Sequence, residues 1–347
     1  MKELLKIYWF AASATLLIWV AAAIWGGWSA LFTVIVLTLL ETTFSADNAV
    51  VNSKVLVTMS AFWQKLFMTA GIFTAVFVVR FIMPILIVML TAGLGFVEVL
   101  NLALQHPHEY EQALAKAEPV ISAFGGTFLI MIALSYFIDY EKQTHWLKFL
   151  ERRLGKLGRF DNITTFILLL VSIVLYATVD PAHHASVLIA AISAMALHIG
   201  LKLLDAAFAG SKRSALSGKT KVGMAAFAAF MYLEVLDASF SLDGVIGAFA
   251  LTSSVVLIMA GLGAGAVWVR AMTIHLVRSK MLNRYIFLEH GAHWAIAFLG
   301  SVMLLKLYHI ELPEWAVGSL GIGFIALAMY WSSRHAPKKP LRSYIGL

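Results

Sequence analysis

The chain has 347 residues, of which 61% are hydrophobic and only 13% are charged, and its mean hydropathy is +0.85. These values exclude a soluble domain with a single core and indicate a polytopic membrane protein. The net charge is +7 and there is no cysteine, which excludes disulfides, thiolate metal sites and thiol redox chemistry. A bound metal ion would therefore need oxygen or imidazole ligands.

Apolar runs of about 20 residues, the length that a helix needs to cross a bilayer, mark the transmembrane segments. We predict an all-α polytopic membrane protein, a single membrane domain over residues 1–347, with about ten transmembrane helices, or about nine. The first apolar run is too long for the core of a signal peptide. The predicted helices span residues 7–26, 29–52, 66–90, 119–138, 162–179, 185–204, 222–249, 254–275, 285–305 and 315–332.

The positions of the lysines and arginines predict the orientation. With the N-terminus in the cytoplasm, all but four of these 26 residues fall on the cytoplasmic side; Lys116 and Lys306 lie outside, and Arg80 and Arg270 lie within the membrane. This asymmetry explains the positive charge without nucleic acid as a partner. We predict a cytoplasmic C-terminus, a basic cytoplasmic loop at 139–161 and a basic cytoplasmic tail at 333–347.

The loops predicted on the two sides of the membrane differ in composition. We interpret the cytoplasmic loop as an amphipathic segment at the inner surface of the membrane. Its predicted membrane-facing stripe consists of Trp146, Leu147, Phe149, Leu150 and Leu154. The outer segments are acidic or carry histidine, and we interpret them as solvated loops, with a vestibule that attracts or releases cations as the alternative. These outer residues are Glu98, His106, His108, Glu109, Glu111, Glu118, Asp180, His183, His184, His309, Glu311 and Glu314.

An acidic signature occurs twice inside apolar segments. The stretches 41–48 and 237–244 share a Phe-Ser-x-Asp core, preceded by an acidic residue four positions before the Ser. A carboxylate at the bilayer centre costs roughly 2.5–3.5 kcal/mol, so such residues indicate a functional site. The second predicted helix runs inward and the seventh runs outward, so the two copies are antiparallel. This pattern is typical of an inverted-topology repeat whose helices meet near the midplane.

One intramembrane arginine follows each signature, Arg80 after Asp47 and Arg270 after Asp243. This match extends the predicted repeat halves to about 29–138 and 222–305. We favour charge pairing of these arginines with the two aspartates, which would lock the helices structurally. The alternative is that they are counter-ions that release the carboxylates when metal binds, and neither role makes them metal ligands.

The first signature, with Glu41, Ser45, Asp47 and Asn48 followed by Arg80, resembles the first-half motif of the TerC family of integral membrane proteins. The second half, with Glu234, Asp237, Phe240, Ser241 and Asp243 followed by Arg270, is similar too. The resemblance covers about half of the chain. It implies an exporter: TerC proteins are associated with tellurium resistance by name, and several members are regarded as manganese exporters. The chain departs from the family pattern at Phe44 and Gly244.

Oxygen ligands line one face of each signature helix. Glu41, Ser45 and Asn48 share a face on a continuous helix, as do Glu234, Asp237 and Ser241, whereas Asp47 and Asp243 lie off these faces. The aspartates therefore face a neighbouring helix, or the helices unwind locally near Asn48 and after Gly244. These hard donors suit Mg²⁺, Ca²⁺ or Mn²⁺. The predicted metal ligands are Glu41, Ser45, Asp47, Asn48, Glu234, Asp237, Ser241 and Asp243.

The charges suggest a coupling mechanism. Five signature carboxylates and two arginines leave a formal excess of about three negative charges, which a divalent cation and one proton would neutralise. Glu289, His290 and His293 are candidates for a proton relay or a secondary ion site, and a polar cluster at the membrane interface is the alternative interpretation.

The sequence contains no phosphate-binding loop, no His-Glu-x-x-His and no Gly-x-Ser-x-Gly motif, so we predict neither an enzyme nor a resident cofactor. We predict a secondary transporter that exports divalent cations through a midplane site, with Mn²⁺ preferred from the family resemblance. The alternatives are a Ca²⁺ or other cation/H⁺ exchanger and a non-transporting membrane partner in tellurite resistance, envelope assembly or secretion. An intramembrane metalloenzyme is the weakest alternative.

We expect the protein to be located in the bacterial inner membrane. Its expected partners are the lipid bilayer and the metal ion that it transports. The sequence predicts no oligomeric state.

Overall fold

The computed structural model describes residues 2–208, 220–249 and 251–335. Within these ranges the regular structure is helical and there is no strand, only an isolated bridge between Met59 and Lys221. The predicted all-α class is confirmed. The helices are α1 (Lys2–Phe44), α2 (Ala46–Leu56), α3 (Ala61–Phe73), η1 (Thr74–Ile82), α4 (Met83–Ala92), α5 (Phe96–Gln105), α6 (Pro107–Phe137), α7 (Lys148–Leu157), α8 (Ile163–Thr178), η2 (Pro181–His183), α9 (His184–Phe208), α11 (Gly223–Ala248), α12 (Val255–Arg278), α13 (Met281–Arg284), α14 (Leu288–Lys306) and α15 (Glu314–Arg334).

Eight helical segments of the described chain are long and apolar enough to cross a membrane, which fits a polytopic membrane protein. A helix satisfies all of its own backbone hydrogen bonds, as hydrocarbon requires. Many of the large apolar side chains on the outside of the bundle are exposed, including Ile24, Trp28 and Leu90, and these suit contact with lipid. The eight segments are Ile7–Thr43, Ala61–Ala92, Pro107–Phe137, Pro181–Leu204, Gly223–Ala248, Val255–Arg278, Leu288–Lys306 and Ala316–Arg334.

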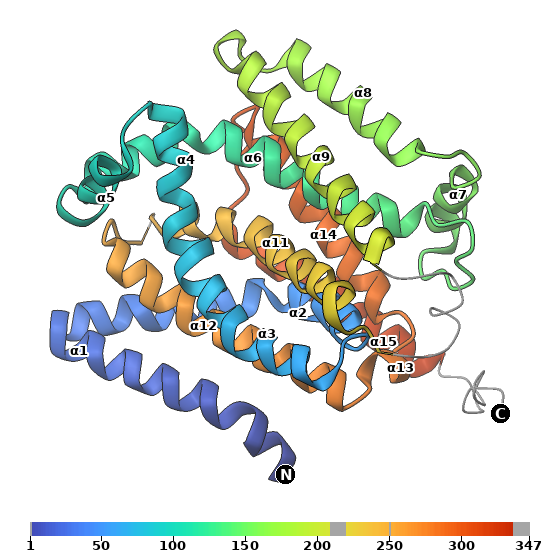
Figure 1. Cartoon of the computed structure of the whole chain (residues 1–347), viewed down its shortest axis with the longest axis horizontal. Coiled ribbons are helices and arrows are strands. Elements are labelled where there is room, and N and C mark those ends of the chain that lie inside the picture. The colour runs from blue at the N-terminus through green and yellow to red at the C-terminus, as the bar shows by residue number, and fades with distance from the viewer. Residues whose placement is uncertain (1, 209–219, 250, 336–347) are drawn as a thin grey trace.

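The first of these segments contains two predicted helices. A straight helix of 37 residues would be about 55 Å long, far more than the roughly 30 Å of hydrocarbon. The chain instead folds back at Gly27, whose φ of 67° and ψ of −154° are non-helical and favour glycine. The two arms of α1 run side by side in Figure 1, and Trp19 on one arm donates a hydrogen bond to Thr38 on the other.

The helices that carry the two signatures lie at the centre of the molecule (Figure 1). A buried apolar cluster joins α2, α6, α11 and α14 through residues such as Val51, Phe128, Leu236 and Ile296. The remaining helices lie around this centre, with α8 and α9 on one side and the first arm of α1 on the other. The carboxylates of Glu41, Asp47, Glu234 and Asp237 are therefore enclosed by protein.

Close helix packing is built around two glycines beside the signature carboxylates. Gly265 of α12 lies against Glu41, and Gly71 of α3 lies against Glu234 and Arg270. A methyl group at either position would overlap these side chains. Glycine therefore lets α12 and α3 approach the charged residues closely enough to contact them.

Two sequence-based expectations about local structure are wrong. The outer segment before the fourth predicted span is not a loop, because α5 forms there and α6 begins at Pro107, twelve residues before the predicted start at 119. The second signature is not unwound, because α11 runs without a break to Ala248 and includes Gly244. Glycine permits a break, but the packing of α11 against its neighbours keeps it helical.

The basic loop contains the short helix α7, which is strongly amphipathic. Of the stripe predicted to face the membrane, Leu147, Phe149 and Leu150 are exposed, whereas Trp146 and Leu154 are partly buried. The buried side of α7 carries Glu151, the one acidic residue between Lys142 and Arg159. The exposed apolar residues remain available to a membrane surface.

Candidate functional site between α2 and α11

The first signature sits where one helix is interrupted and another begins. Ser45 separates α1 from α2, and its hydroxyl donates a hydrogen bond of 2.9 Å to Glu41 Oε1. Asp47 lies in the first turn of α2, where its Oδ1 accepts a hydrogen bond of 2.9 Å from the backbone N–H of Asn48. A helix N-terminus favours a negative charge at this position. The local break predicted in the first signature is therefore present, one turn before Asn48.

Arg80 neutralises Glu41 inside the protein. Its Nη2 lies 2.6 Å from Glu41 Oε1, and its Nη1 donates a 2.8 Å hydrogen bond to the carbonyl of Ala75. Both charged side chains are almost completely buried. Arg80 lies on η1, a π-helical segment, which is a departure from α-helical geometry that often occurs at functional sites.

Arg270 pairs with Glu234 in a matching way. Its two terminal nitrogens each lie 3.2 Å from one oxygen of the Glu234 carboxylate, which forms a two-pronged contact. The guanidinium also donates a 3.1 Å hydrogen bond to the carbonyl of Phe67 and lies over the Phe67 ring. Arg80 with Glu41 and Arg270 with Glu234 are thus two buried ion pairs, one from each predicted repeat half.

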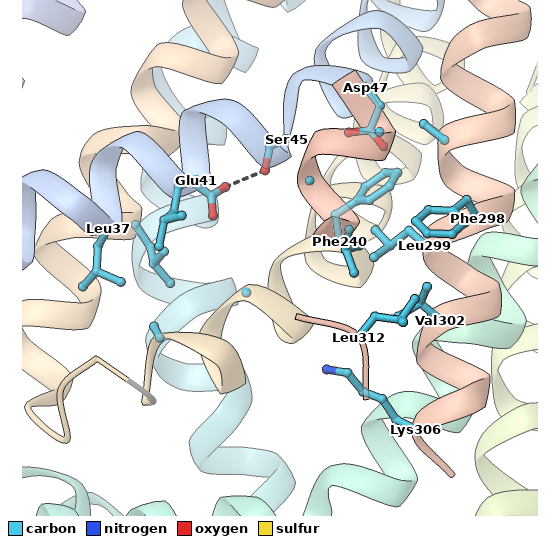
Figure 2. A pocket seen from close by; sticks show the side chains of 18 residues that line it. Leu37, Glu41, Ser45, Asp47, Phe240, Phe298, Leu299, Val302, Lys306 and Leu312 are labelled. Carbon is cyan, nitrogen blue, oxygen red and sulfur yellow. Dashed lines mark hydrogen bonds between the residues drawn. The ribbon is translucent and has the colours of Figure 1, made fainter. Parts of the chain in front are cut away.

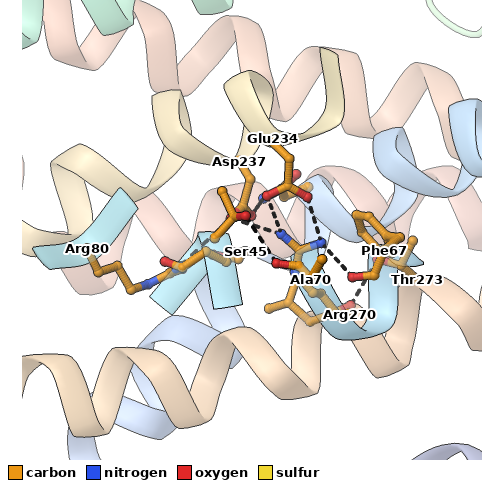
Figure 3. A network of polar contacts seen from close by, with 12 residues as sticks. Ser45, Phe67, Ala70, Arg80, Glu234, Asp237, Arg270 and Thr273 are labelled. Atoms are coloured by element: carbon orange, nitrogen blue, oxygen red, sulfur yellow. Dashed lines mark hydrogen bonds and ion pairs between the residues drawn. The ribbon is translucent and has the colours of Figure 1, made fainter. Parts of the chain in front are cut away.

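Asp237 lies between the two ion pairs. Its Oδ2 is 3.8 Å from Arg80 Nη1 and 3.6 Å from Arg270 Nη2, and Figure 3 shows the carboxylates of Asp237 and Glu234 directed from α11 toward Arg270. Its Oδ1 accepts a 2.9 Å hydrogen bond from the side-chain amide of Asn48. This bond joins the two signatures directly, as the prediction that their helices meet requires.

Several buried oxygens around Asp237 have no hydrogen-bond partner. These are Asp237 Oδ2, Asn48 Oδ1, Asn52 Oδ1 and Ser241 Oγ, all on α2 or α11. Buried polar atoms are nearly always hydrogen-bonded, so each such oxygen indicates a water molecule or an ion. Among the described residues, no group of three or more His, Asp or Glu side chains is close enough together to hold a metal ion. Any ion in this arrangement would need amide and hydroxyl oxygens as well as carboxylates.

The site lies near the middle of the membrane-spanning helices. A cavity of about 90 Å³ is lined by Glu41, Ser45 and Asp47 together with Ala295 and Phe298 of α14, and Figure 2 shows these side chains. α14 covers 19 residues, about 28 Å of helix, and residues 295–298 are at its centre. The cavity is larger than the roughly 10–15 Å³ that one water molecule requires.

The predicted ligands differ in their surroundings. Ser241 is buried next to Asp237, and Asp47 faces the cavity, whereas Glu41 and Glu234 are held by arginines. The predicted pairing of an arginine with Asp47 is therefore wrong. Both guanidinium groups contact the glutamates and Asp237 instead. Asp243 lies on α11, but its side chain is outside the described residues.

The three residues proposed as a proton relay each have a different partner. Glu289 forms an ion pair of 2.8 Å with Lys54, and His293 Nδ1 donates to the carbonyl of Glu289 while its ring stacks on Tyr136. His290 Nδ1 donates a 2.7 Å hydrogen bond to Glu151. These contacts hold the ends of α2, α6 and α14 that are predicted to face the cytoplasm together in one polar cluster.

Glu151 is the residue that the sequence analysis missed. Its buried carboxylate accepts hydrogen bonds from His290, from Trp294 and from the backbone N–H groups of Trp146 and Leu147. Burial alone would raise the pKa of Glu151, but the hydrogen bonds from His290 and Trp294 and the charge of Lys142 outweigh it and lower this pKa to about 2.

We expect Glu151→Gln to destabilise the protein by about 3 kcal/mol, because it leaves the donors around this buried site without a charged acceptor. Since the pKa is lowered from 4.5 to about 2 on folding, Glu151 stabilises the protein above about pH 4.5, and this contribution is lost as the pH falls toward 2. Thermal unfolding in detergent between pH 7 and pH 3 measures both effects. The matched control is Glu141→Gln, an exposed residue of the same loop. Equal melting temperatures for the two variants would contradict this account of Glu151.

A protein-family model matches residues 46–339, which is most of the chain. The chain belongs to the family of proteins of unknown function DUF475. The match includes Asp47, Asn48, both arginines and the whole second signature of this DUF475 protein, and it begins just after Glu41 and Ser45. No curated protein and no solved structure matches the chain.

Proposed function

We propose that this DUF475 protein is a secondary transporter of divalent cations, which bind between α2 and α11. The observation that carries the proposal is that three buried oxygens of α2 and α11, Asn48 Oδ1, Asp237 Oδ2 and Ser241 Oγ, have no hydrogen-bond partner, although the Asn48–Asp237 hydrogen bond joins the two helices. Asp47, which precedes Asn48 in the chain, lines the cavity. Carboxylate, amide and hydroxyl oxygens are the ligands that Mg²⁺, Ca²⁺ and Mn²⁺ prefer.

The charge of the site supports a divalent cation. The four described carboxylates, Glu41, Asp47, Glu234 and Asp237, carry four formal negative charges, and the two guanidinium groups, which contact all of them except Asp47, leave a formal balance of two negative charges. One divalent cation balances these two charges. The carboxyl group of Asp243 would add one further negative charge, which a proton can neutralise, and this is the basis for proposing proton coupling.

The arginines give the site a way to change state. Asp237 lies within 4 Å of both guanidinium groups, so a cation that binds Asp237 competes with them through charge repulsion. In the proposed cycle the arginines hold the carboxylates when the site is empty, and they withdraw toward Glu41 and Glu234 when a cation binds. The arginines act as counter-ions and never as ligands.

The packing of the helices supports the proposed inverted repeat. α2 packs against α12 and α14, and α11 packs against the segments that correspond to them in the other half, η1 and α6. The corresponding segments also pack on each other, α2 on α11, η1 on α12 and α6 on α14. A two-fold exchange of the halves maps these contacts onto one another, which is the pattern expected of an inverted repeat.

The preference for Mn²⁺ and the export direction come from the resemblance of both signatures to TerC proteins, and we propose kinship with that family on the same basis. Ca²⁺ or another cation exchanged for protons remains the alternative substrate, in a bacterial inner membrane. A non-transporting membrane partner, in which the ion pairs only fasten helices, is the alternative from another functional class.

Binding of Mn²⁺ should raise the melting temperature of the purified protein, because a ligand at 100 times its dissociation constant stabilises the folded state by about 2.7 kcal/mol. Asp237→Asn should remove this shift, since it takes away a charged ligand and keeps the side-chain shape. Asp161→Asn, an exposed aspartate, should keep the shift. Potassium chloride at matched ionic strength controls for screening. No shift at millimolar Mn²⁺ or Ca²⁺ would favour the non-transporting partner.

A further inference from the structure

One face of α14 connects the midplane site to the end of the bundle predicted to face outward. Ala295, Phe298, Leu299, Val302 and Lys306 occupy positions i, i+3, i+4, i+7 and i+11 of the helix, which is one face, and all five line the cavity that contains Glu41 and Asp47. Figure 2 shows Asp47 near one end of this lining and Lys306 near the other. The cavity therefore extends from the centre of α14 to its last residue.

Lys306 also borders a second cavity, of about 260 Å³, on the outer side. The lining of this second cavity includes several titratable side chains, Glu118, Asp180, His183, His309 and Glu311. Lys306 Nζ lies 3.9 Å from Glu118 Oε1, and the lysine side chain is 14% exposed. The ammonium group of Lys306 is therefore shared by the outer cavity, which is lined by titratable side chains, and the cavity that contains Glu41 and Asp47.

We propose that Lys306 is a charge gate that restricts the entry of cations from the outer vestibule into the midplane cavity. A fixed positive charge in a narrow apolar passage repels cations and attracts anions, because little water screens it. The ion pair with Glu118 holds the ammonium group of Lys306 where the two cavities share it. The biological role of this gate rests on the proposed transport function. The effect of Lys306 on how fast charged molecules enter the cavity can be measured without transport.

The absence of cysteine makes this access measurable. Leu299→Cys places one thiol in the lining of the cavity, two turns of α14 before Lys306. In membrane vesicles with the outer face exposed, we expect a negatively charged methanethiosulfonate to modify this thiol faster than a positively charged one. Lys306→Gln should raise the ratio of cationic to anionic labelling rates by about tenfold or more, as loss of one nearby unit charge in a poorly screened passage predicts. Lys306→Arg should retain the original ratio.

Lys116→Gln is the matched control, because Lys116 lines only the second cavity and is exposed. It should leave the ratio of rates unchanged. Complete labelling after denaturation confirms that each variant carries a reactive thiol, and an unchanged elution profile confirms that each is folded.

Three results would overturn the proposal. The first is a ratio that Lys306→Gln does not change, and the second is labelling by charged reagents only from the opposite membrane face. The third is labelling by a lipid-soluble maleimide alone, which would mean that the cavity opens to lipid. If labelling follows the prediction but no metal shifts the melting temperature, the transport function fails while the gate stands. If metal binds but labelling ignores Lys306, only the gate fails.

Discussion

Replacement of Arg270 by Met is expected to destabilise the protein by about 3–5 kcal/mol, because it leaves the carboxylate of Glu234 buried without its counter-charge and removes one of the two guanidinium groups beside Asp237. The loss should be at least as large as for Arg80→Met, since each arginine binds one backbone carbonyl but Arg270 also lies over the ring of Phe67. Chemical or thermal unfolding in detergent measures the difference. Arg152→Met, an exposed residue of α7, is the control.

The double variants test whether these losses come from unpaired charge. Arg270→Met combined with Glu234→Gln removes both partners, so it should recover a large part of the stability lost in Arg270→Met alone. The same comparison applies to Arg80→Met with Glu41→Gln. Single variants as stable as Arg152→Met would show that the glutamates are not held by the arginines in the folded protein.

Apolar run length and charge were sufficient to predict the class of fold. The spans predicted at 7–26 and 29–52 separate the two arms of α1 at residues 26–29, and the chain turns at Gly27 within this interval. The start of α6 was missed because the acidic residues before Pro119 suggested a solvated loop. Those residues instead lie on a helix that continues beyond the apolar segment.

The members of the site could be found from the two signatures, but their pairing could not. Spacing along an ideal helix places Asp47 away from the face of Glu41, and it suggests an arginine partner for the aspartate. The interruption at Ser45 and the approach of α12 and η1 instead direct both guanidinium groups to the glutamates. Which side chains meet depends on how helices cross, and helical periodicity within one segment does not contain that information.

The role of Glu151 could not be predicted from the sequence either, because it depends on a partner far away in the chain. The one local signal was a single acidic residue among the six basic residues of segment 142–159. Its principal partner, His290, is 139 positions away along the chain. An isolated opposite charge in a basic loop indicates a buried partner, but it does not identify the helix that supplies it.

Transport of Mn²⁺ into inside-out membrane vesicles tests the central claim most directly. Wild-type protein should accumulate Mn²⁺, whereas Asp47→Asn and Asp237→Asn should reduce the initial rate at least tenfold, because each removes a charged ligand from the site between α2 and α11. Asp161→Asn should transport at the wild-type rate, and Ca²⁺ measured in parallel distinguishes the two candidate substrates. Wild-type transport by folded Asp47→Asn and Asp237→Asn variants would contradict the assignment of this site.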